Sequence, residues 1–184
     1  MSGGQRPVEI RPERAGDERA VADLLASAFA RPVVPELVAS LRRSDWWVEG
    51  LSLTAVVDGE VVGYGLFTSA LVDAPERLVE VLVLSPLGVS PGHQGRGIGS
   101  ALVRAGLALL ATRPEPVVFL EGSPDYYPRF GFRPAVPLGF VPPSPRIPEA
   151  AFMAYLLPSY EPSLRGALVY PDAFWRHDCV GLRP

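Results

Sequence analysis

Two apolar runs flank the stretch Leu87-Gly88-Val89-Ser90-Pro91-Gly92-His93-Gln94-Gly95-Arg96-Gly97-Ile98-Gly99-Ser100, the first typical of a strand and the second of a helix. Within it, glycine alternates at Gly95, Gly97 and Gly99. Glycine adopts left-handed dihedrals and leaves the backbone N–H groups open to a ligand, because it has no side chain. The helix that follows turns its unpaired N–H groups and positive dipole end toward the same place. The stretch therefore predicts a cradle for an anion, and we expect a pyrophosphate.

Length and charge limit the classes of protein that this sequence fits. The 184 residues are enough for one domain with a core of its own, and 48% hydrophobic with 20% charged residues is a globular composition. A net charge of −3 gives no electrostatic reason to expect nucleic acid, whereas a mildly acidic body suits a basic acceptor such as an amine. We expect one domain over residues 1–184. Its core spans about 7–135, and a proline-rich loop and C-terminal extension span about 136–184.

Cysteine content and hydropathy bear on metals and location. Cys179 is the single cysteine, so no internal disulfide is possible and a zinc site built on thiolates is disfavoured. We expect no metal. The segment from Met1 to Ile10 lacks the apolar core of a signal peptide, and no run approaches the ~20 apolar residues of a membrane span. We therefore expect a cytoplasmic protein that does not bind a membrane.

Hydrophobic periodicity predicts a mixed α+β chain in which an antiparallel hairpin precedes a parallel pair of strands. The spacing is helical in three long segments and alternating or continuously apolar in the strands. A right-handed crossover through the third helix makes its two flanking strands parallel. The expected elements are a strand at 8–11, helices at about 18–30 and 35–45, a hairpin of strands 51–57 and 60–70 around Asp58-Gly59, a strand at 78–89, a helix at 97–112, a strand at 117–120, a turn or short helix at 125–132, an irregular ordered loop at 133–148, and strands at 152–157 and 167–170.

Several positions carry finer expectations. Asp17 precedes the first helix and is expected to cap it. Pro86 lies within a strand, and because proline donates no ladder hydrogen bond we expect a bulge or local splay there. Gly106 lies inside the third helix and is expected to weaken it by about 1 kcal/mol relative to alanine. That helix is expected to place on one apolar face Ile98, Leu102, Ala105 and Leu109.

Two common phosphate loops fit the glycine stretch poorly. A P-loop needs a lysine and a serine or threonine after its last glycine, but Gly99 is followed by Ser100-Ala101. A Rossmann dinucleotide site is closer, because Gly95-x-Gly97-x-x-Ser100 nearly matches its fingerprint and Glu121 stands where a ribose-binding carboxylate belongs. Five residues nevertheless separate the strand from the first glycine, and an antiparallel hairpin comes first. The Rossmann pattern stays the less favoured alternative.

A third pattern fits better. The segment Val89-x-Pro91-x-x-Gln94-Gly95-Arg96-Gly97-Ile98-Gly99 resembles the acyl-CoA motif of the GNAT superfamily of N-acetyltransferases, Gln/Arg-x-x-Gly-x-Gly/Ala. Independently, Tyr127-Pro128-Arg129-Phe130-Gly131-Phe132 looks like the family's Tyr-x-x-x-Gly-Phe segment, and the order of elements agrees from about Val8 to Phe132. With the preceding Asp125-Tyr126 and the long C-terminal extension, the sequence looks like the YhbS-like branch.

The resemblance implies a fold and an activity. The fold is a central mixed sheet with an antiparallel N-terminal hairpin, a splayed parallel strand pair and flanking helices. The activity is transfer of an acetyl group from acetyl-CoA to a primary amine by direct attack in a ternary complex, with no metal. The acceptor is a small molecule or a peptide, and the C-terminal extension either closes the acceptor site or builds a homodimer. A non-catalytic acyl-CoA sensor is the alternative of a different class.

The resemblance also implies residue roles. Tyr127 matches the tyrosine that protonates the departing thiolate. The pantetheine amides would pair, like an added strand, with the backbone of Leu87, Gly88 and Val89. The CoA pyrophosphate would be held by the loop and first helical turn at Gln94, Gly95, Arg96, Gly97, Ile98, Gly99 and Ser100.

The group that removes the amine proton is not identified by the resemblance. Some relatives carry a glutamate on the fourth strand, six residues before the position of Val89, and this chain has Val83 there. Glu80, Glu121, Asp125 and a relay of water molecules stay open as alternatives.

Four further residues attract attention near these motifs. Trp46 and Trp47 follow the second helix, and our hypothesis is that one of them lines the acceptor pocket; packing in the core is the alternative. His93 lies in the phosphate loop and is interpreted as a spectator. Cys179 lies in the tail, and direct transfer in the family disfavours a covalent acetyl-cysteine.

Overall fold

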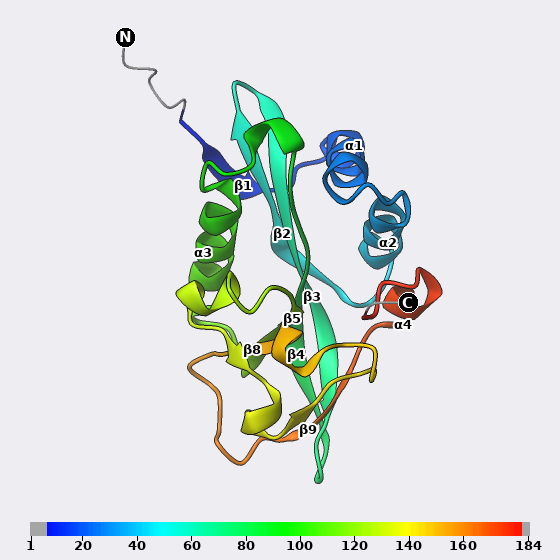
Figure 1. Ribbon diagram of the computed structural model, residues 1–184, viewed down its shortest axis with the longest axis vertical. Coiled ribbons are helices and arrows are strands. Elements are labelled where there is room, and N and C mark those ends of the chain that lie inside the picture. The colour runs from blue at the N-terminus through cyan, green and yellow to red at the C-terminus, as the bar shows by residue number, and fades with distance from the viewer. Residues whose placement is uncertain (1–6, 182–184) are drawn as a thin grey trace.

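The computed structural model describes residues 7–181 and is built around a nine-stranded mixed sheet (Figure 1). The strands follow the order β1-β2-β3-β4-β5-β8-β6, while β9 pairs with β3 and β7. Their bounds are β1 (Glu9–Pro12), β2 (Trp47–Val57), β3 (Glu60–Asp73), β4 (Leu78–Val89), β5 (Val117–Glu121), β6 (Arg133–Pro134), β7 (Phe140–Val141), β8 (Phe152–Leu156) and β9 (Gly166–Val169).

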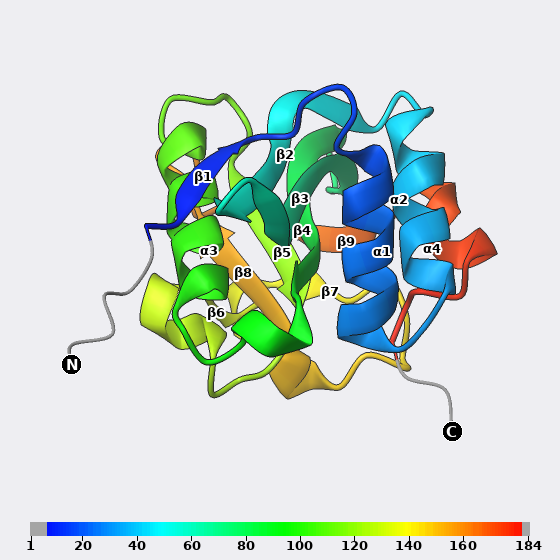
Figure 2. The same cartoon turned by 90° about the horizontal axis from the view of Figure 1, so that it is seen from above.

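Helices cover both faces of this sheet. On one face lie α1 (Glu18–Phe29), α2 (Val33–Arg42) and α4 (Asp172–Arg176), and on the other lies α3 (Ile98–Leu110) (Figure 2). No helix within residues 7–181 is both long and apolar enough to cross a membrane. Single turns of 3-10 helix complete the fold at η1 (Pro91–His93), η2 (Tyr127–Phe130), η3 (Val136–Leu138) and η4 (Glu149–Ala151).

The predicted order of elements is confirmed, including the antiparallel hairpin. Asp58 and Gly59 connect β2 to β3 with φ of 52° and 84°, the positive values that a tight two-residue hairpin turn requires. Parallel pairing is confined, in residues 7–181, to β4–β5 and the two-residue β7–β9 contact. The doubly wound parallel sheet of the dinucleotide alternative is therefore absent from the described chain. The bounds differ from the expected ones at several points: α2 runs from Val33 to Arg42, β2 begins at Trp47, and β3 extends to Asp73. The loop that was expected to be irregular at 133–148 contains the two-residue strands β6 and β7, and the helix α4 was not expected.

The buried face of α3 differs from the predicted one. Ile98 and Leu102 are buried as expected, but Leu109 is 47% exposed. The helix instead turns Val103, Gly106 and Leu110 toward the sheet. A Cβ on Gly106 would lie 2.2 Å from Cε2 of Phe67, so glycine permits the helix to touch a core ring. The residue that weakens the helix locally is thus required by its packing.

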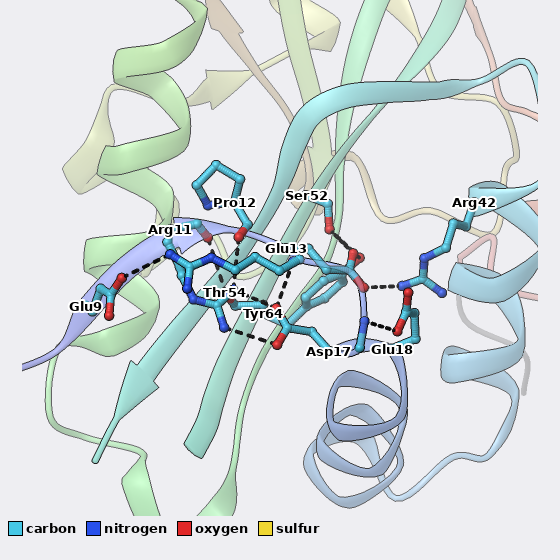
Figure 3. Close-up of polar contacts among 12 residues, drawn as sticks. Glu9, Arg11, Pro12, Glu13, Asp17, Glu18, Arg42, Ser52, Thr54 and Tyr64 are labelled. Atoms are coloured by element: carbon cyan, nitrogen blue, oxygen red, sulfur yellow. Dashed lines mark hydrogen bonds and ion pairs between the residues drawn. The ribbon is translucent and has the colours of Figure 1, made fainter. Parts of the chain in front are cut away.

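The expectation that Asp17 caps α1 is wrong. Its side chain forms no capping hydrogen bond. One carboxylate oxygen instead accepts hydrogen bonds from Nη1 of Arg11 at 2.6 Å and from the backbone N–H of Arg14 at 2.8 Å (Figure 3). The Arg11 guanidinium lowers the pKa of Asp17 through this hydrogen bond, against a smaller opposing effect of burial. Asp17 therefore fastens the start of α1 to β1.

A second carboxylate fastens α2 to the same corner of the sheet (Figure 3). Glu13 is the centre of this contact, and its side chain is only 7% exposed. It accepts hydrogen bonds from Arg42 at 2.5 Å and from the hydroxyl of Ser52. The phenol of Tyr64, buried in the sheet, lies 3.4 Å from the same carboxylate. We call Arg11, Glu13, Asp17, Arg42, Ser52 and Tyr64 the N-terminal polar network.

Candidate functional site

The parallel strands β4 and β5 are paired at one end and separate at the other. Their register contains only Leu82 with Val118 and Val83 with Phe119. Beyond that point β4 continues to Val89, whereas β5 ends at Glu121. The edge of β4 that faces β5 therefore has backbone groups without a ladder partner over its last residues. The predicted splay is confirmed, and we call the space between the two strand ends the opening.

A bulge in β4 lies at the start of the opening. Phe67 of β3 pairs with Leu84, but the next paired residues are Gly65 and Leu87, so β4 carries one extra residue at this point. The extra residue falls at Ser85–Pro86, whose peptide bond is cis. Proline offers no N–H to either neighbouring strand. The bulge expected from Pro86 is confirmed.

The glycine stretch forms a turn that ends on the first turn of α3. Gly95 and Gly97 have φ of 72° and 81°, so both adopt left-handed conformations that disfavour other residues. The first intrahelical hydrogen bond of α3 joins the N–H of Ala101 to the carbonyl of Gly97. The N–H groups of residues 98–100 consequently have no acceptor within the helix. This is the donor arrangement that binds phosphate groups at helix N-termini.

The side chain of Gln94 braces this turn against β4. Its amide Nε2 donates to the carbonyl oxygen of Val89 at 3.0 Å. Ser90 and His93 are joined in the same loop by a contact of 3.0 Å between Oγ and Nδ1. These contacts fix the distance between the end of β4 and the start of α3. The side chains of Gln94, Ser90 and His93 thus hold the shape of the loop.

Arginines and aromatic rings lie beside the turn. Tyr126 brings its hydroxyl to 3.4 Å from Oγ of Ser100, and Arg129 lies over the Tyr126 ring at 4.7 Å. Arg104 of α3 lies over Phe130 at 5.1 Å. Within residues 7–181, Arg96, Arg104 and Arg129 form no ion pair. Their charge is available to a polyanion bound at the turn, and the sequence had pointed only to Arg96.

Tyr127 packs against the end of β5 on the α3 side of the sheet. Its ring meets Phe132 edge-on with the centroids 5.7 Å apart. A Cβ on Gly122 would lie 2.2 Å from the Tyr127 ring, so this glycine admits the close approach. Burial raises the pKa of Tyr127 to about 12. The phenol therefore stays protonated at neutral pH, which makes it a hydrogen-bond and proton donor.

The carboxylates that the sequence left open lie in different places. Glu80 is exposed near the other end of β4, where it accepts a hydrogen bond from Ser69 at 2.7 Å. Asp125 is exposed in the turn before η2. Glu121 is the last residue of β5, half-buried at the opening. Of these three carboxylates, Glu121 is the one that belongs to β5, at the end of the strand beside the opening.

Two segments distant in sequence surround Glu121. Its carboxylate accepts a hydrogen bond of 2.9 Å from the backbone N–H of Gly181. It accepts another from the hydroxyl of Tyr170, which is buried at the end of β9. Burial raises the pKa of Glu121, against smaller opposing effects of these two donors and of Arg146. The pairing of β9 with β3 delivers Tyr170, a contact that no local sequence pattern indicates.

No contact within residues 7–181 places Trp46, Trp47 or Cys179 in the opening. Trp47 packs against the core beneath α2, with Arg42 over its ring at 5.4 Å. Trp46 is half-buried. Cys179 is half-buried in the tail, and burial raises the pKa of its thiol. A role for one tryptophan in acceptor binding stays a prediction.

A cleft of about 490 Å³ lies elsewhere, between the turn that joins β3 to β4 and the loop that joins β8 to β9. Its lining includes Glu80, Arg77 and Arg165 but none of the residues of the glycine turn. Its size alone therefore does not connect it with the chemistry of the opening. Within residues 7–181, no three histidine, cysteine, aspartate or glutamate side chains are grouped as a metal site would require.

Comparison with known proteins agrees with the motifs and the fold. A family model described as an acetyltransferase (GNAT) domain matches residues 9–135. YjhQ of Escherichia coli K12, an uncharacterized N-acetyltransferase, is 35% identical over 144 residues, which are 78% of this chain and 79% of that protein. YhbS from Escherichia coli, solved in complex with CoA, superposes with a TM-score of 0.84 at 27% identity over 96% of each chain. A GNAT family acetyltransferase from Brucella melitensis, solved in complex with acetyl-CoA, has a TM-score of 0.74 at 28% identity, over 92% of this chain and 99% of that one.

Proposed function

The chain belongs to the GNAT family of N-acetyltransferases, and from this premise we propose that it transfers the acetyl group of acetyl-CoA directly to a primary amine in a ternary complex. The observation that carries the proposal is the opening between β4 and β5, which leads to the glycine turn at the start of α3. CoA is a long molecule with a peptide-like arm and a pyrophosphate. An unpaired strand edge followed by a helix N-terminus offers partners for both parts, in that order.

The binding roles follow from the two parts of the site. The pyrophosphate would accept hydrogen bonds from backbone N–H groups of residues 94–100. The arm would pair with the edge of residues 87–89 that faces away from β3, where the Val89 carbonyl also accepts a hydrogen bond from Gln94. Arg96, Arg104 and Arg129 would add positive charge around the nucleotide end. CoA in the YhbS structure and acetyl-CoA in the Brucella melitensis structure support this assignment.

The chemistry requires a hydrogen-bond donor for the carbonyl oxygen of the thioester and a proton donor for its sulfur. A backbone N–H in the opening would donate to the carbonyl oxygen and stabilise the negative charge that develops on it as the amine attacks. The C–N bond forms, the C–S bond breaks, and the sulfur leaves as a thiolate. Tyr127 would give its hydroxyl proton to that thiolate. The high pKa of Tyr127 keeps this proton in place until the leaving group needs it.

The C-terminal segment is proposed to be an integral part of the same domain. Phe140, Phe152 and Phe174 share one buried cluster with residues of α1 and α2. The segment also supplies three strands, β7, β8 and β9, to the central sheet. Either a small molecule or a peptide amine is compatible with this arrangement, and a homodimer stays a proposal to be checked by solution mass.

The test is release of the CoA thiol from acetyl-CoA in the presence of a panel of amines that includes polyamines, amino acids, aminoglycosides and peptides. We expect at least one amine to raise thiol release well above the rate with acetyl-CoA alone. Tyr127→Phe should lower kcat by about 10²-fold or more, because general acid catalysis contributes that amount. Tyr155→Phe is the matched control, since Tyr155 also packs on Phe132 but lies on β8.

An acyl-CoA sensor would behave differently in the same assay. It would bind acetyl-CoA, but no amine would raise the rate of thiol release. Tyr127→Phe would then change neither binding nor rate. That combination of results would contradict the proposed transfer while leaving the binding site in place.

A further inference from the structure

The proposed transfer leaves one proton without a destination. A primary amine is protonated at neutral pH and must lose a proton before its nitrogen can attack the thioester. Tyr127 is a donor and cannot perform this step. The transfer therefore requires a proton acceptor at the opening.

Alternation along β5 places two functional groups on opposite faces of the sheet. Phe119 and Glu121 share the face that α1, α2 and α4 cover, because successive side chains of a strand point to opposite faces. Leu120 and Gly122 share the other face, where Tyr127 packs against the Gly122 backbone. Glu121 and Tyr127 thus flank the end of β5 from its two sides. The thioester would lie between them.

The partners of Glu121 leave it free to take a proton. Its two hydrogen-bond donors within the described residues, the Tyr170 hydroxyl and the Gly181 N–H, are neutral. No arginine, lysine or histidine within residues 7–181 forms an ion pair with it. A carboxylate has about four lone-pair sites, so two hydrogen bonds leave others open. The side chain is half-buried and so is still reachable from outside.

The charged and titratable groups around Glu121 come from three segments. Tyr170 lies at the end of β9, Arg146 in the loop before η4, and Asp178 and Cys179 in the tail. Arg31, in the loop between α1 and α2, reaches the same tail by donating to the carbonyl of Asp178. Arg146 is itself paired with Asp178 at 3.1 Å. Burial outweighs these groups and raises the pKa of Glu121, which brings it nearer to the working range of a general base.

The other buried glutamates lack this combination. Glu13 is paired with Arg42, and Glu115 is paired with Arg113 at the far end of β5. Each therefore has a cationic partner and a place away from the opening.

We propose that Glu121 is the general base of the acetyl transfer and that Tyr170 and the N–H of Gly181 are the groups that position it. This inference rests on the proposed function. The Glu121 carboxylate takes one proton from the ammonium group of the acceptor, and the neutral amine nitrogen then forms the C–N bond. The C–S bond breaks, and the thiolate takes the Tyr127 proton. The second amine proton returns to Tyr127 through water, and Glu121 releases its proton to solvent, so that one proton is released per turnover.

The test measures acetyl transfer to benzylamine, a simple primary amine, together with acetyl-CoA affinity. Glu121→Gln should lower kcat/KM for benzylamine by about 10²–10⁴-fold, the usual contribution of a general base. Its dissociation constant for acetyl-CoA should stay within about twofold, because the proposed base does not hold CoA. Glu80→Gln is the matched control, since Glu80 also lies in the sheet and accepts a serine hydrogen bond but stands far from the opening.

The pH profile distinguishes a base from a residue that only supports the tail. The Tyr170 hydrogen bond lowers the pKa of Glu121, so Tyr170→Phe should raise that pKa and move the acid limb of kcat/KM to higher pH. In Glu121→Gln the acid limb should disappear. An unchanged limb in both variants, or a Glu121→Gln rate within about threefold of the wild type, overturns the proposal.

A separate measurement decides the matter if the wild-type protein acetylates no amine, which would be a failure of the proposed function. The Glu121 carboxyl is then titrated by ¹³C NMR in the acetyl-CoA complex, and its signal is assigned by its loss in Glu121→Gln. A pKa above the ordinary glutamate value that rises further in Tyr170→Phe supports a poised proton acceptor. A pKa at or below the ordinary value overturns it.

Discussion

The N-terminal polar network and the end of β5 bury carboxylates in opposite ways. In the network, Asp17 and Glu13 each accept hydrogen bonds from an arginine, at 2.6 Å and 2.5 Å (Figure 3). At the end of β5, the hydrogen-bond donors to Glu121 within residues 7–181 are neutral. The pKa of Asp17 is accordingly lowered by its arginine, while the pKa of Glu121 is raised by burial. A cation fixes a buried carboxylate in its charged form, and the lack of one leaves it ready to change its charge.

The contrast distinguishes the carboxylates of the network, which stabilise the fold, from Glu121, which we propose acts in the reaction. The network joins β1, β2, α1 and α2 at one corner of the sheet. Glu121 joins β5 to the tail more weakly, because its donors are neutral. These donors would bind a protonated carboxyl less well than a carboxylate, but protonation of Glu121 would leave no buried charge unpaired. Changes to the first group should therefore act mainly on stability, and changes to Glu121 mainly on rate.

The largest effect on stability is expected from Glu13→Ala. The change leaves the Arg42 guanidinium and the Tyr64 hydroxyl without their carboxylate, and breaking a buried ion pair costs about 3 kcal/mol or more. Urea denaturation of the variant should show this loss in the free energy of unfolding. Glu121→Ala should cost clearly less in the same experiment, and equal losses would break the comparison.

A smaller effect with a definite pH dependence is expected from Asp17→Asn. The folded-state pKa of Asp17 lies below its ordinary value of 3.8, so its contribution is present above that pH and is lost as the pH falls through the folded-state pKa. Losing a hydrogen bond between charged groups costs about 1.5–3 kcal/mol. We expect that loss near pH 7 and a much smaller one near pH 2, as measured by denaturation at both pH values. A loss of equal size at both would contradict the pairing.

Arg42→Lys should give a loss of about 1 kcal/mol. Lysine keeps the charge beside Glu13 but loses the planar fork and the stacking on Trp47. Arg43→Lys is the neighbouring control, because Arg43 is exposed at the end of α2. Thermal unfolding at neutral pH compares the two. A loss in the control as large as that in Arg42→Lys would show that the network does not depend on arginine geometry.

The smallest effect on stability is expected from Glu121→Gln, within about 1 kcal/mol at neutral pH because glutamine can still accept both hydrogen bonds. Its sign is opposite to that of Asp17. The folded-state pKa of Glu121 is raised, so the favourable contribution is present below its ordinary value of 4.5 and is lost as the pH rises through the folded-state pKa. The free energy of unfolding of the variant, relative to that of the wild type, should therefore increase between pH 4 and pH 7. If the wild type instead gained stability relative to the variant over this pH range, Glu121 would be held in its charged form.

The sequence predicted the parts of the site that depend on neighbouring residues. The glycine turn, the start of α3 and the bulge at Pro86 all follow from local backbone chemistry, and each is found where it was expected. The segment around Tyr127 was placed by its motif. The catalytic and binding roles of these residues stay predictions.

Long-range packing decided what the sequence did not predict. The helix α3 is rich in leucine and alanine on several sides, so only the contact of Gly106 with Phe67 shows which face is buried. Aspartate is a common capping residue, yet the Asp17 side chain instead accepts a hydrogen bond from Arg11, six positions earlier. Glu121 could not be separated from Glu80 and Asp125, because Tyr170 and Gly181 reach it only through the pairing of β9 and the course of the tail.

Ligand-dependent thermal unfolding tests the central claim, that the opening and the glycine turn bind acetyl-CoA. The purified protein is heated with acetyl-CoA, CoA, NAD or NADP, each in excess. A ligand at about 100 times its Kd adds roughly 2.7 kcal/mol, which raises Tm by roughly 5–11 °C for a domain of this size. We predict this rise with acetyl-CoA and CoA only. A rise with NAD or NADP and none with the CoA species would contradict the account.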